Sequence, residues 1–419
     1  MQIRFARIAN TTALLLAAFC LTPAMSAHAA DKPAAEAKAE SMRAEFSPFV
    51  KAYEEAMKNK DFKTAMEKLA LMDGVANRTE FEDFSIWRMR VATASSMGDN
   101  PATAAAIEKT LSFKRLSPED QNKFGQALIG IRYNMKEYGK VVELLDAQEK
   151  TAALEPNLRN MRIQALYFQK DYKRAIAEAR KDFEVLAKEG KTPLEDSLKL
   201  LLNCYVSLND KDGYVEGMSL LATHYPRKEY WEDLLGRYIG STKNADRFIP
   251  SFYRLKFFMN MMNGADEYTD MADLLLRFGQ PGEAKRVLDK GFEAGVLGKG
   301  GDAKKLNALR DRVNKAAADD AKSLDSVSPA KVKDGSALVN AGYALLINGS
   351  NDKGLALIEQ GLKMPSKKAD ETRLLAAIGY AHAGKKDEAI KLLATVQSAD
   401  GATELAKYWS MNLAKPLLQ

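Results

Sequence analysis

Histidine and cysteine, which carry much of the nucleophilic and metal-binding chemistry of proteins, are rare in this sequence. Its 419 residues include three histidines and two cysteines. His224 and His382 have no further ligand at helical or turn spacing, so a zinc site or a Ser-His-Asp triad has little to draw on. Cys204 lies in an apolar helical stripe, which is typical of a small buried residue. These residues predict no catalytic site and no metal site.

Two other patterns invite a chemical interpretation. The glycines of residues 295–301 suggest a phosphate-binding loop, but Glu293 stands where that motif needs its first glycine, and Gly300 follows the lysine. Adjacent carboxylates such as Glu54 and Glu55 point about 100° apart on a helix and would not converge on one bond. The sequence therefore predicts no cofactor and no enzyme activity.

The most apolar cluster beyond the first thirty residues combines three methionines with two phenylalanines. Its members are Phe257, Phe258, Met259, Met261 and Met262. Such a cluster is typical of core packing, and an apolar binding site is the alternative. We predict that it belongs to the core.

Residues 1–29 have the three parts of a secretory signal. Arg4 and Arg7 are followed by the apolar stretch 13–21 and by the small residues of Ala27-His28-Ala29. This predicts a cleaved signal peptide and a periplasmic mature protein. The apolar stretch is shorter than the about 20 residues that a membrane span needs, and no later segment is long and apolar enough. We expect no membrane span.

Cys20 leaves an alternative open, because bacterial lipoproteins carry their lipid on a cysteine at the end of such a segment. Phe19 stands where the lipoprotein signal has a small residue, which favours cleavage without lipid. An outer-membrane-tethered lipoprotein therefore stays as the alternative to a soluble periplasmic protein.

Positive and negative charges are nearly balanced and interspersed. The chain has 62 basic and 56 acidic residues, and loss of Arg4 and Arg7 with the signal lowers the net charge from +6 to about +4. A weak, unclustered charge is not typical of nucleic-acid binding, so we expect no nucleic-acid partner. The abundance of Ala, Leu, Lys and Glu, with only 13 prolines, favours helix throughout.

Residues 30–47 are alanine-rich, charged and poor in large apolar side chains, which predicts a flexible leader. From Pro48 onward the sequence repeats a polar turn between two apolar-periodic helices, with a small residue shortly after the turn. The small positions are Ala65, Val141, Ala175, Ala284, Gly354 and Ala389, with looser counterparts at Thr103, Tyr214 and near Arg247. They recur about every 34 to 39 residues, and one gap of about 70 predicts a degenerate unit between Ala284 and Gly354.

The stretch Trp231-x2-Leu234-Leu235-x2-Tyr238 resembles the first-helix pattern W-x2-L-x3-Y of the tetratricopeptide repeat (TPR) family. The resemblance covers roughly residues 48–413. It implies an all-α fold in which antiparallel helical hairpins stack into a right-handed α-solenoid. A small residue lets two paired helices approach closely where they cross. Hairpins must stack because one hairpin cannot cover its own apolar stripe.

The period is interrupted near 242–262 and near 300–335. These breaks fit either kinks in one solenoid or a boundary between two superhelices. We predict an N-terminal TPR-like array over residues 48–300 and a C-terminal TPR-like array over residues 301–419, continuous with the first.

The same resemblance implies where a partner would bind, because the first helices of successive TPR hairpins line a concave groove. The residues expected to face it are Gln126, Tyr133, Asn160, Gln164, Tyr167, Lys199 and Asn203. Amide, phenol and ammonium groups can bind the backbone and carboxylates of an extended peptide. Lys199 and Asn203 also match the carboxylate-clamping type of the family. Asp233, Asp266 and Asp270 stand where that type needs amides and bases, so we expect no such clamp.

The segments 224–235 and 270–300 also resemble a group of exported proteobacterial TPR proteins associated with TonB/ExbB-type energy transduction. We therefore predict a periplasmic scaffold of the Gram-negative cell envelope that binds a protein or peptide partner, in envelope assembly or a TonB-type complex. The sequence does not determine its oligomeric state. A factor in peptidoglycan metabolism is the alternative, although repeats that continue to Leu413 leave no segment of ~150 residues for a catalytic domain.

Overall fold

The computed structural model describes residues 40–241, 244–298, 303–324 and 332–417. Every regular element in these ranges is a helix, and none of those helices has the length and apolarity to cross a bilayer. The predicted signal peptide, Cys20 and residues 30–39 of the predicted leader lie outside them. The last residues of the leader are not loose, because Phe46 is buried and Arg43 binds the Glu82 carboxylate at 2.8 Å. The packed array therefore begins before Pro48.

The chain forms two compact units, Met1–Asp210 (unit 1) and Lys211–Gln419 (unit 2). The helices of unit 1 are η1 (Ala44–Phe46), α2 (Ser47–Lys58), α3 (Phe62–Asp73), α4 (Glu80–Met97), α5 (Asn100–Ser112), α6 (Pro118–Asn134), α7 (Tyr138–Glu149), α8 (Pro156–Phe168), α9 (Tyr172–Lys188) and α10 (Glu195–Ser207). The helices of unit 2 are α11 (Lys211–His224), α12 (Lys228–Ile239), η2 (Asp246–Phe248), α13 (Ile249–Phe258), α14 (Gly264–Arg277), α15 (Pro281–Glu293), α16 (Ala303–Leu324), α17 (Gly335–Ile347), α18 (Asn351–Leu362), α19 (Ala369–His382), α20 (Lys386–Leu393) and α21 (Ala402–Ala414).

One kind of turn recurs between the helices. One residue with left-handed backbone is followed by a residue whose N–H donates to the carbonyl five positions earlier, as Asp171 does to Leu166 at 3.0 Å. This closes the first helix in a Schellman motif and starts the second. The left-handed residues are Lys60, Gly98, Lys136, Lys170 and Asn209 in unit 1, and Asn260, Gly279, Gly349 and Gly384 in unit 2. Their recurrence explains the period of the sequence.

The predicted small positions lie five residues after the left-handed residue of the turn, where the second helix crosses the first. Ala65, Val141, Ala175, Ala284, Gly354 and Ala389 are all buried, which confirms the register of these units. Among the looser counterparts only Thr103 is buried. Tyr214 is half-exposed, with Gly213 buried instead, and Arg247 is exposed in η2.

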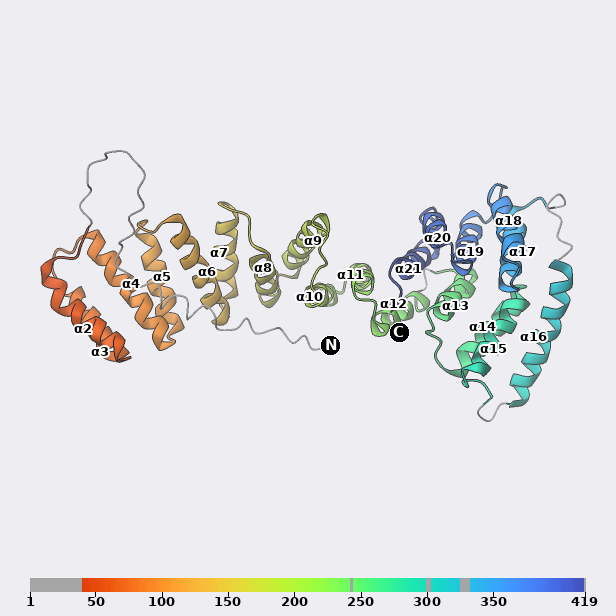
Figure 1. Cartoon of the computed structure of the whole chain (residues 1–419), viewed down its shortest axis with the longest axis horizontal. Helices are drawn as coiled ribbons and strands as arrows, with labels where there is room; N and C mark the ends of the chain where they lie inside the picture. Colours follow the sequence, from red (N-terminus) through yellow and green to blue (C-terminus); the bar gives the residue numbers. More distant parts are fainter. Residues whose placement is uncertain (1–39, 242–243, 299–302, 325–331, 418–419) are drawn as a thin grey trace. The chain divides into compact units, whose positions relative to one another are not determined.

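Within unit 1 the helices pack in chain order. Each helix from α2 to α10 contacts the next one along the chain, and α8 also contacts α10 (Figure 1). The apolar interior of unit 1 includes separate clusters between the helices, one around Leu69 and one around Leu128. Unit 1 is therefore an α-solenoid of stacked antiparallel hairpins, as predicted.

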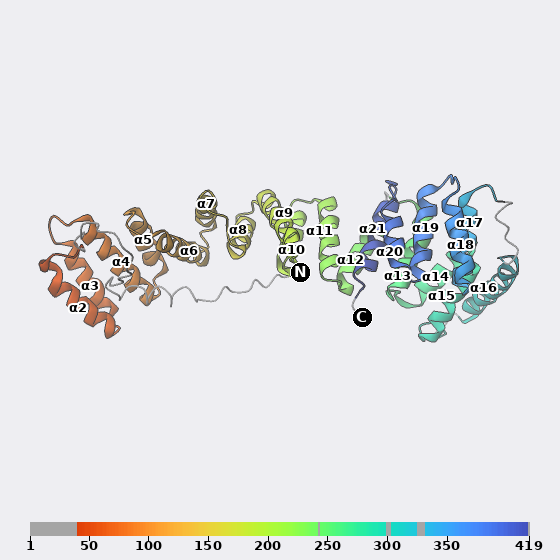
Figure 2. The same cartoon turned by 45° about the horizontal axis from the view of Figure 1, so that its top comes forward.

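Unit 2 departs from this simple stack, because its last helix returns to its first ones. Helix α21 contacts α11 and α13, and both views show it beside α12 (Figures 1 and 2). Tyr408 of α21 packs edge-on against Trp231 and Tyr238 of α12. The apolar face of α12, whose sequence resembles a TPR first helix, is thus covered by α21, which lies about 170 residues later in the chain.

The boundary predicted at 300/301 lies inside unit 2, since the contacts divide the chain at 210/211 instead. The interruption near 300–335 contains the long helix α16, which packs on α14 and α15. It occupies the place of the degenerate unit expected between Ala284 and Gly354.

Helices α17 and α18 approach closely through two pairs of glycines. A Cβ atom on Gly342 would lie 2.6 Å from the Gly354 carbonyl oxygen, and one on Gly335 would lie 2.2 Å from the Gly361 carbonyl oxygen. Because these neighbours are backbone atoms, they cannot move aside without separating the helices.

Replacing Gly342 by alanine should therefore separate α17 from α18. We expect Gly342→Ala to lower the free energy of unfolding by about 1–3 kcal/mol. Gly236→Ala is the matched control, because Gly236 is exposed on α12 with nothing within 4 Å of its Cβ position. It should raise stability by about 0.5–1 kcal/mol through helix propensity. Scanning calorimetry of the two variants measures both effects, and equal shifts would contradict the proposed crossing.

A charged side chain at the crossing in unit 1 should be more damaging. Ala175→Arg would bury an unpaired charge between α8 and α9, and we expect a loss of several kcal/mol. Ala177→Arg, on the exposed face of the same helix, should change stability little. Urea unfolding followed by circular dichroism compares them, and an unchanged midpoint for Ala175→Arg would show that the register is wrong.

Candidate functional site

The seven residues predicted to face a groove lie on every second helix of unit 1, and all are half-buried. We call them the polar row: Gln126 and Tyr133 on α6, Asn160, Gln164 and Tyr167 on α8, and Lys199 and Asn203 on α10. These helices are separated along the chain by α7 and α9, so the row depends on stacking of the hairpins.

Hydrogen bonds connect the row from one helix to the next. The Tyr133 hydroxyl donates to Gln164 Oε1 at 2.6 Å, which joins α6 to α8. The Ser197 hydroxyl donates to Asn160 Oδ1 at 3.3 Å, which joins α10 to α8. Ser197 was not predicted. The structure thus brings residues of three successive hairpins together on one face.

The members of the row differ in whether their polar groups already have a hydrogen-bond or ion-pair partner. The side-chain amides of Gln126 and Asn203 have no hydrogen-bond partner in the described part of the chain. The Lys199 ammonium lies 2.6 Å from the Glu195 carboxylate, which is one turn away. Because its charge is already balanced, Lys199 is a poor candidate for holding a free carboxylate. That the row binds a partner stays a prediction.

A chain of five half-buried aromatic rings adjoins the row and was not predicted as a site. Tyr138 and Phe168 stack with their centroids 4.8 Å apart. Tyr133 packs edge-on against Tyr138 at 5.6 Å, and Tyr167 lies 5.6 Å from Phe168 and 5.7 Å from Tyr172. The signal was present in the sequence, because two tyrosines five residues apart flank both turns.

Burial affects the thiol and phenol groups near the row in the expected direction. Cys204 is fully buried, which raises the pKa of its thiol to about 12 and confirms that it packs as a small apolar residue. Burial also raises the pKa of Tyr133 to about 12, and the pKa of Tyr167 is raised by burial and by the nearby Tyr172 and Cys204. All three groups are neutral near pH 7, so the row offers hydrogen bonds rather than negative charge.

Buried arginines join the helices of unit 1. Arg162 on α8 is 2% exposed and binds Glu149 of α7 at 2.6 Å and Glu178 of α9. Arg132 on α6 is bound in the same way by Glu108 and Glu137. These ion pairs are structural, because each guanidinium is enclosed by its carboxylates.

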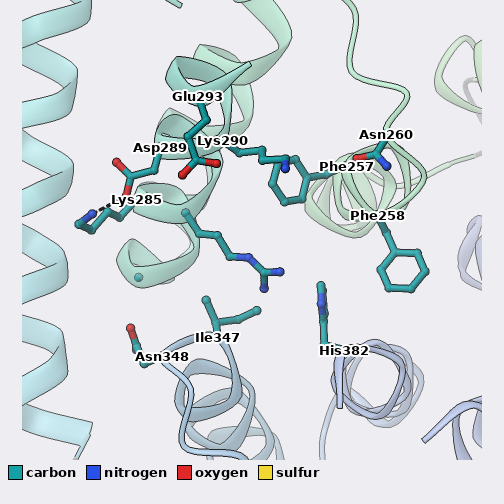
Figure 3. Close-up of a pocket in the computed structure, with 12 residues that line it drawn as sticks. Phe257, Phe258, Asn260, Lys285, Asp289, Lys290, Glu293, Ile347, Asn348 and His382 are labelled. Carbon is teal, nitrogen blue, oxygen red and sulfur yellow. Dashed lines mark hydrogen bonds and ion pairs between the residues drawn. The ribbon is translucent and has the colours of Figure 1, made fainter. Parts of the chain in front are cut away.

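Unit 2 contains a second candidate site, a cavity of about 720 Å³ lined by residues of α13, α15, α17 and α19 and their turns (Figure 3). Phe257 and Phe258 contribute aromatic surface, whereas Met259 and Met261 of the same cluster are buried. Phe257 and Met262 pack against the core cluster around Met271. The prediction that this cluster belongs to the core therefore holds for the methionines and for Phe257, whereas Phe258 is half-buried and lines the cavity together with Phe257.

A buried polar network lies next to the cavity. Glu283 of α15 accepts hydrogen bonds from Arg254 Nη2 of α13 and from the Tyr343 hydroxyl of α17, each at 2.6 Å. His382 of α19 packs against the rings of Phe258 and Tyr343, and burial lowers its pKa to about 4. His382 is therefore a neutral interhelical residue. Among the described residues no group of three His, Cys, Asp or Glu side chains could hold a metal ion.

Comparisons with known proteins leave the family open. No family model matches this chain. No curated protein matches it either. Similar solved structures include the TPR2AB domain of yeast Sti1 in complex with pHSP90, with 13% identity, coverage of 68% of this chain and 96% of that chain, and a TM-score of 0.24. Yeast Tom70 has 13% identity, 88% coverage of each chain and a TM-score of 0.24. The apo form of the quorum sensor NprR from B. thuringiensis has 13% identity, coverage of 89% and 96%, and a TM-score of 0.20. At these scores the fold rests on the helices described above.

The ion pair between Glu149 and Arg162 should make unit 1 sensitive to acid. The guanidinium lowers the pKa of Glu149 to about 2, below the value of about 4.3 in an unfolded chain. The pair therefore stabilises the fold above pH ~4.3, and this contribution is lost as the pH falls toward 2. We expect Glu149→Gln to destabilise the protein at pH 7 and to have a smaller effect at pH 3.

The matched control for this prediction is Glu143→Gln, an exposed position on the same helix without an ion pair in the described residues. It should unfold like the parent protein at both pH values. Urea titrations at pH 7 and pH 3 give the comparison. An effect of Glu149→Gln that is the same at both pH values would show that its charge is not involved.

Proposed function

We propose that this protein is an exported scaffold that holds an extended segment of a partner protein along the polar row of unit 1. The observation that carries the proposal is the pair of hydrogen bonds, Tyr133 to Gln164 and Ser197 to Asn160, which hold half-exposed amides in register on α6, α8 and α10.

The spacing of the row suits an extended peptide. Packed helices lie about 8–10 Å apart, and an extended chain advances about 3.3 Å per residue. One helix of the row therefore meets roughly every third residue of a peptide that crosses the stack. Each amide offers two N–H donors and one carbonyl acceptor, so it can bind peptide backbone without requiring one sequence.

The five aromatic rings supply the apolar half of such a surface. Half-buried tyrosines offer a large contact area and lose little conformational freedom on binding, which is why they are frequent at the centres of interfaces. Tyr133 and Tyr167 belong both to the polar row and to the ring chain. A partner with an apolar side chain near its bound backbone would use both surfaces.

The cellular place of the protein is part of the same proposal. Residues 1–29 have the pattern of a secretory signal, which supports export to the periplasm. A scaffold there would act in assembly of the cell envelope or in an energy-transduction complex of the TonB type, as the sequence resemblance implies. The near-balanced charge of the chain supports a protein partner rather than a nucleic acid.

Photo-crosslinking in cells tests the proposal. A benzophenone amino acid placed at Tyr167 or at Asn203 should form adducts with the same partner, because both positions belong to the polar row. Lys173, exposed on the second helix α9, is the control position and should not form that adduct. Mass spectrometry of the adducts identifies the partner and the segment that is bound.

Two further variants distinguish specific binding from proximity. Gln164→Ala should reduce the adduct formed from Asn203, because it removes an amide at the centre of the row. Glu143→Gln, on α7, should leave it unchanged. Equal adducts from Lys173 and Asn203, or none from the row, would refute the proposed function.

A further inference from the structure

The charged wall of the cavity in unit 2 is one face of α15. It presents Lys285, Arg286, Asp289, Lys290 and Glu293, which together have a net charge of +1. Lys285 and Asp289 form an ion pair. Figure 3 shows the Lys290 side chain extending toward Phe257, whereas Lys285 is turned to Asp289 on the other side.

Two cations of this wall, Arg286 and Lys290, are not part of an ion pair among the described residues. Both are exposed. They are one helical turn apart on the same face, where like charges repel and destabilise a helix. Glu293, one turn further on, likewise has no ion pair among the described residues and compensates part of this charge. An anion beside Arg286 and Lys290 would relieve the repulsion between them.

The opposite wall of the cavity is uncharged. Phe257 and Phe258 line it from α13, and Ile347 lines it from the end of α17. The His382 ring is neutral because burial and the positive charges of Arg286 and Arg254 outweigh the effect of Glu283 and lower its pKa. The Arg254 and Glu283 charges below balance each other.

Polar groups without charge complete the lining. Asn348 donates through Nδ2 to the Ala344 carbonyl at 2.9 Å, which holds its side chain in place at the mouth of the cavity. Gly282 of α15 faces it, and a Cβ atom there would lie 3.1 Å from the Asn348 amide. The volume of about 720 Å³ falls within the range of about 300–1,000 Å³ that small-molecule sites occupy.

We propose that this cavity binds a small organic anion whose head group lies on Arg286 and Lys290 and whose apolar body packs against Phe257, Phe258 and Ile347. The head group is a carboxylate or a phosphate ester, since guanidinium and ammonium groups bind both. The site is on unit 2 and is independent of the partner proposed for unit 1. It gives the protein a ligand-binding function in addition to a scaffold function.

Calorimetric titration of the full mature chain with simple probes tests this inference. Octanoate and octyl phosphate carry the two head groups on the same apolar body, acetate and inorganic phosphate lack the body, and octan-1-ol lacks the charge. We expect the two octyl anions to bind more tightly than acetate, phosphate or octanol, and the tighter of the two identifies the head group. Their affinity should fall as salt is added.

Variants connect the binding to the cavity. Arg286→Gln and Lys290→Gln should each weaken binding of the octyl anions by roughly tenfold or more, as loss of one charged hydrogen bond does. Lys391→Gln, an exposed position on α20 outside the cavity, should bind like the parent protein. Circular dichroism checks that all three remain folded. Three outcomes would overturn the proposal. Octanol could bind as tightly as octanoate, Arg286→Gln and Lys290→Gln could bind the octyl anions as tightly as the parent protein, or neither octyl anion could bind.

Discussion

The close crossing of paired helices is the constraint on which the rest of this structure depends. A left-handed residue ends the first helix, and the second helix then crosses it where the side chain is small, as at Ala175 and Gly354. A larger side chain would separate the two helices, and the hairpins could no longer stack in register. The polar row follows from this register, because its members lie on α6, α8 and α10 and meet only when the intervening helices are correctly packed.

The two units use buried charge in different ways. In unit 1, arginines such as Arg162 are bound by carboxylates on the preceding and following helices, which joins neighbours in the stack. In unit 2, Glu283 gathers Arg254 and Tyr343 from helices that are far apart in sequence. A buried pair of this kind contributes little net stability, but breaking it leaves an unpaired charge, so it favours one arrangement of the helices over others.

These arrangements suit two kinds of binding. A stack of similar hairpins repeats the same amide and aromatic groups at regular intervals, and an extended peptide repeats its backbone groups in the same manner. Unit 2 instead folds back through α21, and several of its helices line an open cavity with one charged and one apolar wall. A concave site of limited volume suits a small molecule better than a peptide chain. The scaffold and ligand-binding proposals therefore rest on different physical features.

The sequence by itself determined the features that depend on short spacing and local chemistry. The polar turn, the small residue shortly after it and the buried Cys204 could be predicted, because helical periodicity places them without knowledge of distant segments. The residues of the polar row were implied by the family resemblance, and their binding role stays a prediction. Only the tertiary structure decided that Tyr408 packs against Trp231, that Glu283 meets Arg254 and Tyr343, and that the chain divides at Asp210 rather than near residue 300. These contacts join residues up to about 180 positions apart, and a local pattern cannot select one distant partner among many equally apolar or charged ones.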